Sequence, residues 1–114
     1  MPPILIIRSA FPRQKLREYV LGDRGFVKAV VDCEKKIMAV GGALHADCEQ
    51  KLLEEGSSQE NLWGINMYPQ EDAENWIEFD SMINIRPQQG NRTRGVESPT
   101  MQKQILKVVS LLLQ

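Results

Sequence analysis

The chain has 114 residues, 42% hydrophobic and 25% charged, which fits one globular domain with its own core and leaves no room for a second. The net charge of −1 argues against a general nucleic-acid coat, and no apolar run approaches the roughly 18 residues of a membrane span. The first apolar run has only about four residues before Arg8, too few for an export signal. Two cysteines in such a chain are expected to stay reduced, which predicts a cytoplasmic protein.

The first 25 residues predict an edge strand and a short helix. Residues 4–8 form an apolar run typical of a strand, and the proline pair at positions 2–3 suits the edge of a sheet. A helix of about ten residues is expected to start at residues 11–12, because proline is tolerated in the first helical turn. Gly22 and Gly25 end its apolar stripe.

The next segments predict a β-hairpin and a second helix. Residues 26–31 and 36–40 alternate in the manner of two strands, and the polar residues 32–35 suit the turn between them. Residues 43–55 are good helix formers followed by Gly56 as a stop signal. The apolar stripe of this helix is expected to consist of Leu44, Cys48 and Leu52.

Two further strands are predicted in the second half of the chain. Residues 62–68 alternate before Pro69, and a polar, acidic loop at 70–75 leads to the clearest strand, residues 77–86. One face of this last strand is mainly apolar, and the proline after Arg86 ends it. The opposite, mainly polar side of this strand carries Glu78, Asp80, Asn84 and Arg86.

A final helix is predicted to begin with Ser98 as N-cap and Pro99 at its first position. Its wide apolar stripe favours packing on the sheet, or alternatively a face shared with a second subunit in a homodimer. The order β-α-β-β-α-β-β-α predicts a single α+β domain with a mixed or antiparallel sheet of about five strands. We expect the helices to pack on one face, leaving the other open to solvent, a ligand or a partner.

The loop after the strand at 77–86 has the composition of an anion site. The planar guanidinium of arginine can donate two parallel hydrogen bonds to a carboxylate or phosphate. Glycine lets backbone amides approach an anion, and the helix N-terminus at Ser98 adds a favourable dipole. The alternative is a surface loop whose arginines balance residues 43–80, which hold ten of the 15 acidic residues. The spacing matches no known phosphate-binding motif. The candidate ligand-binding residues are Asn84, Arg86, Gly90, Asn91, Arg92 and Arg94.

A second group of reactive side chains lies on the helix at 43–55. His45, Cys48 and Glu49 share one side of a helix, which suits a nucleophile with its base, and Asp80 is the candidate general base outside this helix. Alternatively, these three residues and Cys33 provide four zinc ligands, or Cys48 is a core thiol beside a hydrogen-bonded histidine. With no CxxC motif and one histidine, we expect neither a metal nor a cofactor.

Asp80 also has a structural interpretation, as the partner of an ion pair. A carboxylate in mid-strand needs a cation, and Arg86 or Arg92 is the expected one. The tryptophans are expected to be core or rim residues, because the chain lacks the aromatic and basic interleaving of RNA-binding modules.

The blocks HADCE, LWGINMYP, WIEFDSMINIRP and GNR resemble a family of small bacterial and archaeal proteins known as domain of unknown function 5674. The resemblance runs from about Val27 to the final helix and implies neither a substrate nor an active site. The leading hypothesis is therefore a binding module for an anionic or nucleotide-like ligand. The alternatives are a small hydrolase or transferase and a structural or dimeric interaction protein.

Overall fold

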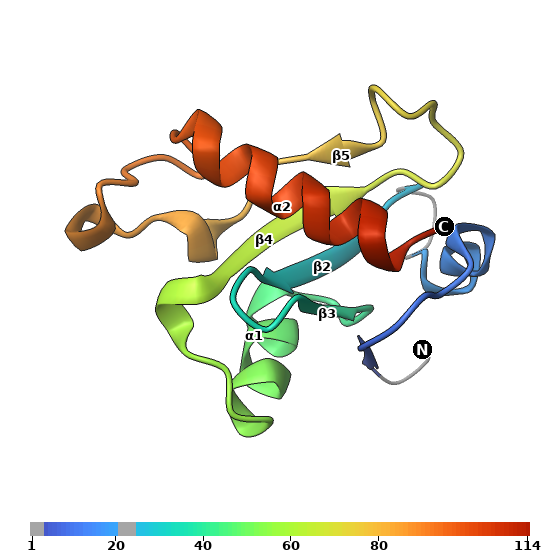
Figure 1. Cartoon of the computed structure of the whole chain (residues 1–114), viewed down its shortest axis with the longest axis horizontal. Coiled ribbons are helices and arrows are strands. Elements are labelled where there is room, and N and C mark those ends of the chain that lie inside the picture. Colours follow the sequence, from blue (N-terminus) through green and yellow to red (C-terminus); the bar gives the residue numbers. More distant parts are fainter. Residues whose placement is uncertain (1–3, 21–24) are drawn as a thin grey trace.

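The structure, a computed structural model, describes residues 4–20 and 25–114, so the proline pair at 2–3 and Gly22 lie outside the described residues. Five strands form one antiparallel sheet in the order β1-β3-β2-β4-β5 (Figure 1). The strands are β1 (Leu5–Ile7), β2 (Val27–Asp32), β3 (Ile37–Val40), β4 (Leu62–Met67) and β5 (Ile77–Glu78). The helices are α1 (His45–Glu54), α2 (Pro99–Leu112) and the 3₁₀ helices η1 (Arg13–Tyr19), η3 (Gln59–Asn61), η4 (Met82–Asn84) and η5 (Pro87–Gln89). The α+β class, the five strands and the β2–β3 hairpin are confirmed.

The two α-helices cover opposite faces of the sheet, whereas the sequence led us to expect all helices on one face. The helix α2 packs with Ala29 and Val31 of β2, and α1 packs with Val30 between them (Figure 1). Every residue of β3 and β4 is buried, and apart from Gly64 and Asn66 these strands carry apolar side chains on both faces. A sheet whose central strands are apolar on both faces needs a cover on each side.

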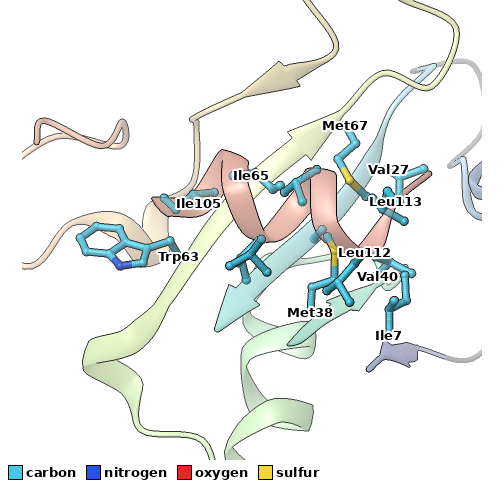
Figure 2. Packing of buried hydrophobic residues seen from close by; sticks show 14 of the residues in the cluster. Ile7, Val27, Met38, Val40, Trp63, Ile65, Met67, Ile105, Leu112 and Leu113 are labelled. Atoms are coloured by element: carbon cyan, nitrogen blue, oxygen red, sulfur yellow. The ribbon is translucent and has the colours of Figure 1, made fainter. Parts of the chain in front are cut away.

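The larger core lies between the sheet and α2. Ile105 and Leu112 of α2 pack over Ile65 and Met38 of the sheet (Figure 2). The start of α2 follows the prediction, because Ser98 Oγ accepts a hydrogen bond from the backbone N–H of Met101 at 3.2 Å. Burying each such side chain contributes about 1.5–3 kcal/mol, so these contacts hold α2 on the sheet.

Two expected elements differ in form. The first helix is the 3₁₀ helix η1, with Pro12 as its N-cap. The strand expected at 77–86 ends at Glu78, because Ser81 turns the chain into η4 by accepting a hydrogen bond from the N–H of Ile83 at 3.3 Å. Within 4–20 and 25–114, no helix combines the length and apolar character needed to cross a membrane.

Candidate functional site

Asn84, a predicted ligand residue, completes the edge of β4 where β5 has ended. Its Oδ1 accepts from the N–H of Gly64 at 2.8 Å, and its Nδ2 donates to the carbonyl of Gly64 at 3.0 Å and to that of Arg94 at 2.9 Å. The side-chain amide thus makes the two bonds that a neighbouring strand residue would make. Asn84 is fully buried, and both of its amide protons are used within the chain.

Arg86 continues this edge by the same means. Its Nη2 donates to the carbonyl of Leu62, and its Nη1 donates to Gln59 O at 2.5 Å and Gln89 Oε1 at 3.1 Å. The guanidinium carbon lies 4.3 Å from the centre of the Trp63 ring, a cation–π contact. Burial lowers the pKa of Arg86 from its ordinary value. The guanidinium therefore joins its loop to β4.

Gly90 and Asn91 build the turn of the arginine loop. Gly90 ends η5 in the left-handed region with φ of 79°, which glycine adopts without strain. The buried Nδ2 of Asn91 donates to the carbonyl oxygens of Asn84 at 2.7 Å and Gly95 at 2.8 Å, while its Oδ1 accepts from the N–H of Glu97 at 2.8 Å. Asn91 is therefore a hub that fixes the loop.

The backbone amides expected to receive an external anion bind a carboxylate of the chain itself. Glu97 accepts hydrogen bonds from the N–H groups of Arg92 and Thr93. The side chain of Arg92 is exposed, and Arg94 donates from Nε to Asp80 Oδ1 at 2.7 Å. The partner of Asp80 is therefore Arg94 rather than Arg86 or Arg92, in an exposed ion pair worth at most about 1 kcal/mol.

On α1, the candidate catalytic residues His45, Cys48 and Glu49 each bond to a different partner and not to one another. Cys48 is fully buried, its thiol donates to the carbonyl of Gly41 at 3.0 Å, and burial raises its pKa to about 12. Glu49 is half-buried and lies 3.5 Å from the amide of Gln59. The buried stripe contains His45 in place of Leu44, which is exposed. Across the described ranges, no three His, Cys, Asp or Glu side chains gather closely enough to hold a metal.

His45 lies at the start of α1, over β4. Its Nε2–H donates to the carbonyl of Ile65 at 2.8 Å, which leaves Nδ1 as an acceptor on the neutral ring. Burial lowers the pKa of His45, so the imidazole is neutral at pH 7. Gly64 makes room for the ring, because a Cβ there would lie 3.2 Å from His45 Cδ2 and 2.6 Å from Ser81 Cβ.

Beside His45, three strands contribute one row of polar side chains on the α1 side of the sheet. Lys28 of β2 pairs in register with Asn66 of β4, which pairs with Glu78 of β5. Asn66 Nδ2 and Tyr68 Oη both donate to Glu78 Oε1, at 2.9 and 3.0 Å. The charges of Lys28 and Asp80 both act on the pKa of His45. We call this cluster the polar face: Lys28, His45, Asn66, Tyr68, Glu78 and Asp80.

Asn66 has an unused acceptor in the middle of the polar face. Its Nδ2 is directed at Glu78 Oε1 and the carbonyl of Asp80, and because both are acceptors the amide has only one favourable orientation. Its Oδ1 is buried and makes no hydrogen bond of normal geometry in the part of the chain described by the structure, although the Asn66 side chain is close enough to His45 to act on the pKa of that ring. Leaving an acceptor buried and unsatisfied costs about 1–3 kcal/mol. A donor from outside the chain would remove that cost.

The structure thus brings His45 and Asp80 to the polar face, with Arg94 bound to Asp80 at its rim. It does not bring Cys48 or Arg86 there. Sequence reasoning missed Lys28 and Asn66, which lie on different strands and become neighbours only through the sheet register. The available signal was a polar residue between two apolar ones in a buried strand: Lys28 between Val27 and Ala29, and Asn66 between Ile65 and Met67.

The fold is that of a small α+β domain with a five-stranded antiparallel sheet and one α-helix on each face. Beside α1 lies the polar face, with the acceptor of Asn66 that is unpaired within the described residues. The chain belongs to the family described as "Protein of unknown function (DUF5674)", whose model matches residues 5–112. No curated protein and no solved structure matches the chain. Membership confirms the resemblance and assigns neither a ligand nor a reaction.

Proposed function

We propose that this protein is a binding module for a small anionic ligand that also carries an N–H or O–H donor, and that the ligand binds on the polar face. The observation that carries the proposal is the buried, unpartnered Oδ1 of Asn66, whose residue is only 5% exposed. Two other buried side-chain atoms of the described residues lack a hydrogen-bond partner, Trp63 Nε1 and Arg86 Nε. Both belong to the stacked pair of Arg86 and Trp63, in which the guanidinium already lies against the ring.

The charge of the ligand is inferred from Lys28. The ion pairs formed within the described residues are Arg8–Glu55 and Asp80–Arg94, so no carboxylate of residues 4–20 or 25–114 lies within pairing distance of the Lys28 ammonium. Arg94 supplies a second cation at the rim. An anionic group near Lys28 would gain a charge-assisted hydrogen bond, which is roughly twice as strong as a neutral one.

An aromatic pair next to Lys28 favours a ligand with a flat ring. The rings of Phe26 and Tyr68 lie 5.4 Å apart, and the ammonium of Lys28 lies 5.4 Å from the centre of the Phe26 ring. A phosphate near Lys28, a ring against this pair and an amino group donating to Asn66 would together satisfy the site. These are the features of a nucleotide-like molecule, which is the class that we propose.

Binding is better supported than the hydrolase or transferase alternative. A nucleophilic Cys48 would need a depressed pKa and an open approach, whereas its thiol is fully buried and its pKa is raised. His45 remains a neutral acceptor close to Asp80, and in the binding module it orients the ligand. Within the arginine loop, the exposed guanidinium of Arg92 is the group that remains available to an anion.

Thermal unfolding with a panel of nucleotides and inorganic phosphate tests the proposal. A ligand at about 100 times its Kd stabilises by roughly 2.7 kcal/mol, which raises Tm by roughly 10 °C in a domain of this size. Lys28→Gln is expected to abolish this shift, and Arg92→Gln and the control Lys103→Gln are expected to keep it. Loss of the shift in Arg92→Gln alone would move the ligand to the arginine loop. If no compound raises Tm, the proposal fails.

A further inference from the structure

A second candidate site lies on the opposite side of the sheet, where α2 faces the chain entering β5. A pocket of about 420 Å³ opens there, within the range of small-molecule sites. Its walls are mainly apolar and come from α2 and from residues 73–79. The apolar lining consists of Ala73, Trp76, Ile77, Phe79, Leu106, Val109 and Leu113. The pocket shares no lining residue with the polar face.

One cation is fixed at this pocket, whose remaining lining is apolar except for Glu74 and Ser110. The guanidinium of Arg13 stacks on the ring of Trp76, with its carbon 3.8 Å from the ring centre, and its Nη2 donates to the carbonyl of Glu71 at 2.6 Å. These two contacts orient the group and leave the donors of Nε and Nη1 without an assigned partner in the described chain. Glu74 also lines the pocket, but it forms no ion pair with Arg13.

We propose that this pocket binds a small amphiphilic carboxylate, with its apolar body between α2 and β5 and its carboxylate on Arg13. The planar guanidinium can donate two parallel hydrogen bonds to a carboxylate, and a group held by stacking loses little freedom in doing so. Leu106, which is 41% exposed at the pocket wall, would lose water contact when the ligand binds. The inference is independent of the function proposed for the polar face.

The test uses decanoate, below its micelle concentration, and decanol as the uncharged probe. The chain has two tryptophans, and Trp76 lines the pocket whereas Trp63 does not, so the fluorescence of Trp63→Phe reports on the pocket. We expect saturable binding of decanoate in Trp63→Phe and no change in Trp76→Phe. A flat titration in Trp63→Phe would overturn the proposal.

Variants of Arg13 separate the carboxylate contact from apolar binding. Arg13→Gln is expected to weaken decanoate by about tenfold or more and to leave decanol within about twofold. Arg13→Lys keeps the charge but loses the planar fork and its stacking on Trp76, so its decanoate affinity should lie between those of Arg13→Gln and the parent. Unchanged decanol binding in both variants shows that the loss does not come from misfolding. Lys15→Gln, also on η1, is the matched control. If Arg13→Gln binds decanoate as well as the parent does, the proposal is wrong.

A second copy of the chain is the competing occupant, since Leu106 and Leu111 on α2 are both exposed. Sedimentation of the parent and of Leu106→Asp decides between them. A monomeric parent, with decanoate binding lost in Leu106→Asp, supports the ligand pocket. A dimer that Leu106→Asp converts to monomer would assign this face to self-association and overturn the proposal.

Discussion

Asn84 holds Gly64 by both of its backbone groups, so a side-chain amide stands where the next residue of β5 would otherwise pair. The same amide reaches the carbonyl of Arg94 and thereby joins β4 to the arginine loop. Asn84, which the sequence analysis predicted to contact a ligand, is therefore part of the sheet edge.

Asn84→Ala should destabilise the protein by about 2–4 kcal/mol. The substitution leaves the N–H of Gly64 and two carbonyl groups without their partner in a buried place, and each unsatisfied group costs about 1–3 kcal/mol before relaxation. Urea unfolding measures the change, with the exposed Gln88→Ala as control. A loss below about 0.5 kcal/mol would contradict the edge role, because surface substitutions have effects of that size.

Gly64→Ala should cost about 1–3 kcal/mol through overpacking, since the new methyl group would lie 2.6 Å from Ser81 Cβ and 3.2 Å from His45. The double variant Gly64→Ala, Ser81→Gly should recover part of this loss, because it removes the nearer contact. Denaturant unfolding of the two single variants and the double variant gives the coupling energy. Strictly additive effects would show that the clash lies elsewhere.

His45 should make stability fall as the pH drops from 7.5 to 5.5. Burial lowers its pKa in the folded state, so the unfolded chain, with an ordinary pKa of 6.5, takes up a proton first. The contribution of His45 is therefore fully present above pH 6.5 and is lost as the pH falls toward the folded pKa. His45→Gln should flatten this slope. The chain has one histidine, so its NMR titration is unambiguous, and a pKa above 6.5 in the folded protein would refute the prediction.

Cys48 should react with iodoacetamide far more slowly than a peptide thiol at pH 8. Its thiol is fully buried, and burial raises the pKa to about 12, so almost no thiolate is present. Cys33 is half-buried, and burial raises its pKa to about 11, so it should react faster than Cys48 but still slowly. Intact mass after timed alkylation, with urea-unfolded protein as control, measures both. Rapid modification of Cys48 would instead support the alternative of a hydrolase or transferase with Cys48 as its nucleophile.

The fold class and most elements follow from local sequence patterns, because turns, caps and alternation act over a few residues. The end of β5 does not, since the polar residues from Asp80 to Arg86 continue the alternation of a strand while Ser81 and Asn84 turn the chain by side-chain hydrogen bonds. Alternation alone does not distinguish a polar side chain that faces water from one that replaces a backbone partner.

The candidate site was predicted only in part. His45 and Asp80 were identified by residue type, but Lys28 and Asn66 meet through a strand register that local patterns do not encode. The place of the polar face depends on α1, which packs on Val30 and Leu62 on the same side of the sheet. That packing is a tertiary contact, which local sequence patterns do not predict.

The covering of β4 by side chains also bears on how the chain avoids joining other molecules. An unpaired strand edge is a template for addition of a strand from a second molecule. In the folded chain the side chains of Asn84 and Arg86 occupy backbone groups of Gly64 and Leu62 that such a strand would use. Residues 84–86 therefore block the addition of a strand from another molecule. Variants without the Asn84 and Arg86 side chains are expected to give insoluble protein during expression before any effect on ligand binding is measured.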